Sequence, residues 1–218
     1  MRVIPIIIIL VIGLIASDCI LFYEPNLYVK NKYTWYVHIA NKQITISKEL
    51  ALQSINKAEK LNPDRNEAIR LKIVVFQSLD KHEVAQNSIS QLKNDDPFYY
   101  YANGINMLNQ ENLIDAEKYL REGIEQFPDY APNYYISAIV NFRLGNKEAS
   151  YLRAINGLNK VNVSYQKYQY EKYIFIKKNE FIGLLLGIKE YISSGSIKKC
   201  KKYYPHCVIS TRRNLNIH

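Results

Sequence analysis

The most regular feature of the chain is a pattern of small and apolar positions that recurs in three stretches, each ending in a proline. The stretches read SKELALQSINKAEKLNP, KHEVAQNSISQLKNDDP and NLIDAEKYLREGIEQFP, and they end at Pro63, Pro97 and Pro128. Aligned on the proline, they share three columns at spacing i, i+4 and i+7, which is one face of an α-helix. Because proline lacks an N–H and disfavours helical geometry in the preceding residue, we expect each helix to end there. The columns are Ala51, Ala85 and Ala116; Ile55, Ile89 and Leu120; and Ala58, Leu92 and Gly123.

A second apolar-periodic stretch precedes each of these helices. In PFYYYANGINMLNQ, the side chains of Tyr100, Gly104 and Met107 share one face. A fourth pair reads APNYYISAIVNFRLGNKEAS and YLRAINGLNKVN, with Gly145 at the turn between its helices. The sequence therefore predicts about four helical hairpins, and small residues are expected where the two helices of a hairpin approach each other. The predicted hairpins are 32–65, 66–97, 98–130 and 131–162.

This arrangement resembles the tetratricopeptide repeat (TPR) family over about residues 32 to 162. The resemblance implies an all-α solenoid whose concave groove is lined by the first helix of each hairpin and holds a partner peptide. The first helix of the 66–97 unit departs from the pattern, and the family's carboxylate clamp is not matched. A generic bundle of helical hairpins is the alternative. The matching features are an early aromatic (Trp35, Tyr100, Tyr134), a small residue one turn later (Gly104, Ala138), the alanine column and the closing prolines.

The expected groove positions follow from helical phase, opposite the packing columns. Aromatic residues flanked by arginine at both ends favour an apolar peptide with an acidic group or a terminal carboxylate. In the alternative register, the aromatics are packing residues within the repeats. The predicted groove residues are Arg70, Val74, Gln77, Tyr101, Ile105, Asn109, Tyr135, Ile139, Phe142 and Arg143.

Residues 163–192 are predicted to form a helix that caps the array, with apolar residues such as Phe181 and Leu184 at helical spacing. A helix lying on a membrane surface is the alternative. The basic tail, 193–218, is expected to be solvated and disordered. Cys200 and Cys207 are candidates for a disulfide if the chain is exported, and a metal site that also uses His206 matches no known zinc spacing.

Charge is unevenly distributed along the 218 residues, which carry a formal net charge of +9. Residues 63–162 contain 11 basic and 13 acidic residues, whereas residues 163–218 contain 11 basic and 3 acidic residues. A nucleic-acid footprint spread over the repeats is therefore not expected. The basic character belongs to the last quarter, where phospholipid headgroups or nucleic acid could bind.

The N-terminal residues 1–23 are predicted to be a signal peptide or a transmembrane anchor. The run Val3–Ser17 is uncharged, and Ala16 and Ser17 resemble a cleavage site. An uncleaved anchor would use residues 3–22, and a buried core helix is the remaining alternative. Arg2 before the run and acidic residues after it place the repeats on the extracytoplasmic (periplasmic) side of a bacterial-type membrane. Residues 24–31 are expected to be a linker.

The sequence predicts no catalytic, cofactor-binding or metal-binding residues. The chain has no P-loop, G-x-G-x-x-G or G-x-S-x-G motif, and its four histidines are scattered. The sequence therefore predicts a non-enzymatic module, anchored or exported, that binds a protein or peptide partner. One alternative is a lipid- or nucleic-acid-binding protein acting through the basic tail, and another is an enzyme with an unrecognised site.

Overall fold

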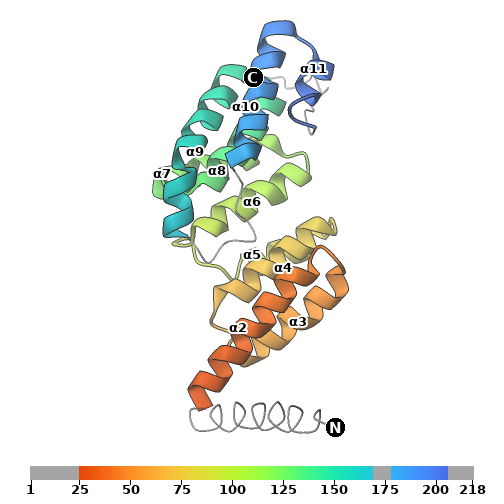
Figure 1. Cartoon of the computed structure of the whole chain (residues 1–218), viewed down its shortest axis with the longest axis vertical. Helices are drawn as coiled ribbons and strands as arrows, with labels where there is room; N and C mark the ends of the chain where they lie inside the picture. The colour runs from red at the N-terminus through yellow and green to blue at the C-terminus, as the bar shows by residue number, and fades with distance from the viewer. Residues whose placement is uncertain (1–24, 169–177, 206–218) are drawn as a thin grey trace, which may run out of the picture. The chain divides into compact units, whose positions relative to one another are not determined.

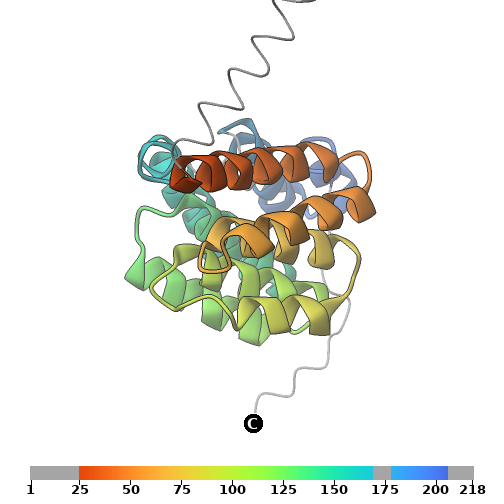
Figure 2. The same ribbon diagram turned by 90° about the horizontal axis from the view of Figure 1, so that it is seen from below.

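The computed structural model describes residues 25–168 and 178–205, and within these ranges ten α-helices pack in neighbouring pairs (Figures 1 and 2). The all-α prediction is confirmed, and the paired packing is consistent with a solenoid-like fold. The chain divides into two compact units, residues 1–75 and 76–218, and each is described by itself. The predicted signal or anchor at 1–23 lies outside the described residues. Among the helices at 25–168 and 178–205, none has both the length and the apolar character required to span a bilayer.

The first unit is built on a hairpin of α2 (Pro25–Gln43) and α3 (Lys48–Leu61). Ser47 caps α3 by accepting the Leu50 N–H, as serine does at helix N-termini. The predicted column is buried, since Ala51, Ile55 and Ala58 are all fully inaccessible. The expectation of a linker at 24–31 is wrong, because α2 already begins at Pro25. Proline suits the first turn of a helix.

The prediction that Trp35 is the packed early aromatic of this hairpin is also wrong. Trp35 is 56% exposed, whereas Tyr33 is 1% exposed and is the aromatic that packs. The difference of two residues arises because both positions carry an aromatic and because α2 starts earlier than the expected boundary at 32.

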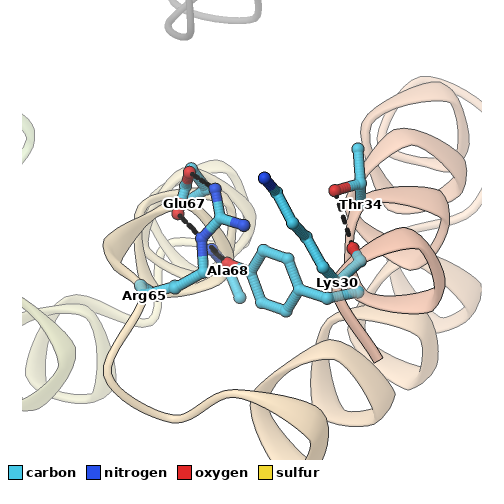
Figure 3. Close-up of polar contacts among 6 residues, drawn as sticks. Lys30, Thr34, Arg65, Glu67 and Ala68 are labelled. Carbon is cyan, nitrogen blue, oxygen red and sulfur yellow. Dashed lines mark hydrogen bonds and ion pairs between the residues drawn. The ribbon is translucent and has the colours of Figure 1, made fainter. Parts of the chain in front are cut away.

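Tyr33 is held by the start of α4 (Asn66–Ser78), a helix that runs across the boundary between the two units. The Ala68 N–H donates to the Tyr33 hydroxyl at 3.2 Å, and that hydroxyl lies 3.2 Å from Glu67 Oε2. The Arg65 guanidinium bonds to Glu67 and lies 4.6 Å from the centre of the Tyr33 ring (Figure 3). Burial alone would raise the pKa of Glu67, but the bonds from Arg65 and other donors outweigh it and lower that pKa. On the facing helix, Thr34 donates to the Lys30 carbonyl at 2.9 Å (Figure 3).

The second unit contains the remaining helices, which alternate as first and second members of hairpins. Asn112 caps the second helix of one hairpin, and Gly145, in the left-handed conformation at φ 85°, ends the first helix of the next as expected. The helices are α5 (His82–Ile89), α6 (Pro97–Asn109), α7 (Leu113–Gln126), α8 (Ala131–Leu144), α9 (Lys147–Lys167), α10 (Lys178–Ser194) and α11 (Ile197–Lys201).

The expectation that Pro97 ends a helix is wrong. Helix α5 ends at Ile89, and Pro97 is instead the first residue of α6. The intervening residues are rich in Asn and Asp, which favour turns and N-caps over helix interiors. Asp96 is 4% exposed and caps α6 by accepting the Phe98 N–H at 3.0 Å. Pro63 and Pro128 do lie two residues beyond the ends of α3 and α7.

Glycines mark a packing arrangement that repeats with a step of 34 residues in the second unit. A Cβ added to Gly123 on α7 would lie 2.5 Å from Tyr100 Cβ on α6. A Cβ added to Gly157 on α9 would lie 2.7 Å from Tyr134 Cβ on α8. Tyr100 and Tyr134 differ by 34 residues, as do Gly123 and Gly157. The close approach predicted for the two helices of these hairpins is therefore present.

The contact between Gly104 and Leu120 gives a testable consequence. We expect Gly104→Ala to lower the free energy of unfolding of the second unit by about 1–3 kcal/mol, because the new Cβ would lie 2.6 Å from Leu120 Cγ. In a Leu120→Ala background the same change should be stabilising, since the space is open and alanine favours a helix by about 1 kcal/mol over glycine. The next hairpin has alanine at both corresponding positions, Ala138 and Ala154. Denaturation of wild type, the two single variants and the double variant measures the coupling energy between the two positions. Additive effects on the free energy of unfolding would count against this contact.

Candidate interaction site

Three of the ten predicted groove residues are inaccessible to a partner. Arg70 and Gln77 are each 6% exposed and Phe142 is 3% exposed, so these three are buried. Asn109 is exposed, and the other six are half-buried. Arg70 and Val74 belong to the first unit and the other eight to the second. The expectation that all ten side chains face a groove is corrected accordingly.

Gln77 and Arg143 have contacts that tie helices together. The Gln77 side-chain amide donates to the Ala102 carbonyl on α6 at 2.7 Å. Arg143, at the end of α8, pairs with Glu111 in the turn between α6 and α7. Gln77 and Arg143 therefore contribute to the fold of the second unit.

Helices α10 and α11 cover the α8 positions that were predicted to face a partner. The Tyr135 ring lies 5.0 Å from that of Phe181, and the Phe142 ring lies 5.2 Å from that of Tyr191, both edge-on. Phe142 belongs to a buried cluster, and Tyr135 and Ile139 pack against it. For α8, the alternative register, in which the aromatics are packing residues, is the one observed. The other buried members of the cluster are Ala138, Ala154, Leu184, Ile188, Cys200 and Tyr204.

Two of the three predicted groove residues of α6, Tyr101 and Ile105, also make packing contacts. The Tyr101 ring lies 5.6 Å from that of Phe98 and 6.4 Å from that of Tyr130. Ile105 packs against the cluster that contains Leu120. Tyr101, Ile105 and the exposed Asn109 remain predicted partner contacts that no observation tests.

The first part of the basic tail is packed, which corrects the expectation of disorder for residues 193–205. Cys200 is 1% exposed and Tyr204 is 8% exposed. A Cβ added to Gly187 on α10 would lie 2.8 Å from Tyr204 Cβ and 3.2 Å from Cys200 Sγ. Cys200 is disulfide-bonded. The other two cysteines of the chain, Cys19 and Cys207, lie outside the described residues, so a pairing of Cys200 with Cys207 stays a prediction.

Tyr135 titrates at high pH, which provides a test of the packing of α10 and α11 on α8. Burial, with the nearby Glu180, raises the pKa of Tyr135 to about 12, and a bond with Tyr204 acts in the opposite direction. The folded-state pKa lies above the ordinary value of 10.0, so the folded protein is stabilised by the protonated Tyr135 hydroxyl. This contribution to the free energy of unfolding is complete below pH 10 and is lost as the pH rises toward 12. We expect Tyr135→Phe to flatten the loss of unfolding free energy over that range, measured by denaturation at each pH. The exposed Tyr165→Phe is the control, and equal slopes for Tyr135→Phe and wild type would exclude a buried Tyr135 hydroxyl.

An apolar pocket lies between α9 and α10, with a volume of about 480 Å³. The side chains of Leu152 and Ile192 line it and are 58% and 44% exposed. Glu148 and Lys189 provide one charge of each sign. Within the second unit, this pocket combines an accessible apolar surface with polar groups that could orient a partner. Its lining residues are Glu148, Tyr151, Leu152, Lys189 and Ile192.

Sequence reasoning missed this pocket because none of its residues belongs to a motif. The available signal was a leucine or isoleucine on the outward face of a helix, such as Leu152 opposite the small residues Ser150, Ala154 and Gly157. No group of His, Cys, Asp or Glu side chains within 25–168 and 178–205 has an arrangement suited to a metal ion.

Comparison with known proteins adds no identification: no family model, no curated protein and no solved structure matches the chain.

Proposed function

We propose that the chain is a non-enzymatic, TPR-type protein-interaction module whose partner binds at the pocket between α9 and α10. The observation that carries the proposal is the accessible apolar surface of Leu152 and Ile192 beside a pocket of about 480 Å³. Exposed apolar patches with a polar rim are typical of protein-binding surfaces. The site differs from the predicted concave groove, since the α8 residues of that groove pack against α10 and α11.

We also propose a location for the module, which rests on the N-terminal sequence. An apolar segment at 3–22 would hold the repeats at a bacterial-type membrane, or direct their export, on the extracytoplasmic side. A partner protein is then expected in the same compartment. The proposal needs no cofactor.

The test is co-purification after chemical crosslinking in cells, with full-length wild type and two variants. Leu152→Glu places a charge at the pocket, and Ile114→Glu makes the same change at an equally exposed position, 58% in both cases. The proposal predicts a protein bound to wild type and to Ile114→Glu in comparable amounts and depleted from Leu152→Glu. Equal capture by all three would show that the pocket is not the binding surface. Circular dichroism establishes that the helix content of the variants is unchanged.

A second candidate is binding of anionic lipid through the basic C-terminal segment. The observation that favours it is the set of exposed lysines on and beside α11, including Lys198, Lys201 and Lys202. Neutral substitutions at these three lysines should then abolish salt-sensitive sedimentation with vesicles containing phosphatidylserine. Unchanged sedimentation would eliminate this candidate, and the same variants assayed with DNA test the nucleic-acid alternative.

A further inference from the structure

Helix α10 occupies the place that the first helix of another hairpin would take. A Cβ added to Gly123 would meet Tyr100 from its own hairpin and Asn133 from the next first helix, α8. A Cβ added to Gly157, one repeat later, would meet Tyr134 from its own hairpin and the Phe181 ring from α10. Phe181 therefore stands on α10 where Asn133 stands on α8.

This correspondence fixes which face of α10 should pack against a second helix. On α8, Tyr134 and Ala138 come one and five residues after Asn133. On α10, Ile182 and Leu186 come one and five residues after Phe181, so they are the corresponding residues. Tyr134 and Ala138 are 7% and 0% exposed because α9 covers them. Ile182 and Leu186 are 38% and 43% exposed. The face of α10 that matches a buried hairpin interface is thus open to solvent.

Helix α11 does not cover that face. It lies on another side of α10, where the Tyr203 carbonyl approaches Gly183 and Cys200 approaches Gly187. These glycines correspond to Tyr135 and Ile139 of α8, which is the side predicted to be concave. Arrays of stacked hairpins require an end with a polar outer face to stay soluble, and α10 presents isoleucine and leucine instead.

We infer that a second copy of this chain covers the open face of α10, packing reciprocally on the same face to form a twofold-symmetric dimer. A twofold interface joins one surface patch to itself, so the patch has to be self-complementary. The α9–α10 pocket borders this face, because Lys189 follows Ile182 and Leu186 at i+7 and i+3 on α10. The two surfaces together meet the requirement, since the pocket adds Glu148 on α9 and apolar Leu152 and Ile192. In a dimer, Glu148 of one copy can pair with Lys189 of the other while the apolar side chains meet between them.

Charge favours this occupant over a lipid surface. The pocket rim carries one acidic and one basic residue, whereas the lysines that suit anionic lipid lie on and beside α11, on a different side of α10. An apolar patch with one charge of each sign suits a copy of itself. The inference rests on the proposed function and names the partner at the pocket and at the α10 face that borders it.

The experiment co-expresses two full-length copies with different affinity tags, purifies on one tag and measures the other. Wild-type copies should co-purify. Leu186→Glu in both copies should reduce co-purification by about tenfold or more, as expected for a central apolar contact. Ile114→Glu in both copies, an exposed position on α7, should leave it unchanged. Helix content measured by circular dichroism separates loss of the dimer from loss of the fold.

A charge exchange provides a second measurement that needs no change to the apolar surface. Copies that both carry Glu148→Lys, or both carry Lys189→Glu, should co-purify less than wild type because like charges meet across the interface. A Glu148→Lys copy paired with a Lys189→Glu copy should recover co-purification, since both cross-pairs then join opposite charges. Absence of recovery would overturn the twofold arrangement.

Two outcomes separate this inference from the proposed function. If wild-type copies do not co-purify while a different protein depends on Leu152 for capture, the inference is wrong and the proposed function stands. If neither a second copy nor another protein depends on the pocket, both fail. Co-purification that survives Leu186→Glu also overturns the inference, because the contact then lies elsewhere.

Discussion

Replacing Phe181 by alanine is expected to lower the free energy of unfolding by about 3–5 kcal/mol, the range for a fully buried aromatic side chain. Phe181 is 0% exposed, its ring fills the space beside Gly157, and it packs edge-on against Tyr135. It also belongs to a cluster with Ala131 and Val161, so the truncation leaves a cavity where α8, α9 and α10 meet. Truncation of Phe181 should therefore weaken the packing of α10 against α8 and α9.

Denaturation monitored by circular dichroism measures this effect, with Val163→Ala on α9 as the control. Val163 is 44% exposed and lies outside the α10 face assigned to a second copy, so its truncation should cost less than about 1 kcal/mol. If Phe181→Ala also costs less than about 1 kcal/mol, α10 is not packed on α8 and α9 in the way described.

Replacing Gly123 by leucine is the second change with a large expected effect, a destabilisation of about 3 kcal/mol or more. The first atom of the new side chain would lie 2.5 Å from both Tyr100 Cβ and the Asn133 side-chain amide. A Cβ atom of a helix cannot swing away, so α6 or α8 has to move, which is the most costly form of overpacking. The preference of helices for leucine over glycine offsets only about 1 kcal/mol.

Lys118→Leu is the control for the glycine substitution, because it adds leucine to the exposed side of the same helix. It should change the free energy of unfolding by no more than about 0.5 kcal/mol. A Gly123→Leu variant as stable as this control would mean that α7 does not approach α6 and α8 closely. It would also remove the basis for the repeat step of 34 residues.

The hairpins could be predicted from the sequence because small and apolar residues at i, i+4 and i+7 indicate the buried face of a helix. Ala116, Leu120 and Gly123 are buried on one face of α7, as their spacing indicates. Pro97 was misplaced because proline is compatible both with the residues after a helix and with its first turn, and only the length of α5 decides between them. The pattern predicts Trp35 as the early aromatic, whereas Tyr33 is the one that packs, because the pattern does not show where α2 begins.

The candidate site was harder to predict than the fold, for a physical reason. Aromatic residues such as Tyr135 and Phe142 serve equally well as partner contacts and as packing contacts, and the choice depends on whether another helix covers them. Here α10 and α11 do, so substituting Phe142 would test the core of the second unit rather than a binding surface. The pocket at Leu152 is formed by two helices that are joined through residues 169–177, and no local pattern brings them together.

The central claim is that the face formed by α9 and α10 is the interaction surface of this protein. The most direct measurement is photocrosslinking in cells, with a photoreactive phenylalanine analogue placed at Leu152, Leu186 or Ile114 of the full-length chain. Crosslinks to a protein, including a second copy of the chain, are predicted from Leu152 and Leu186 and not from Ile114. Crosslinks from Ile114 alone, or from none of the three positions, would contradict the claim.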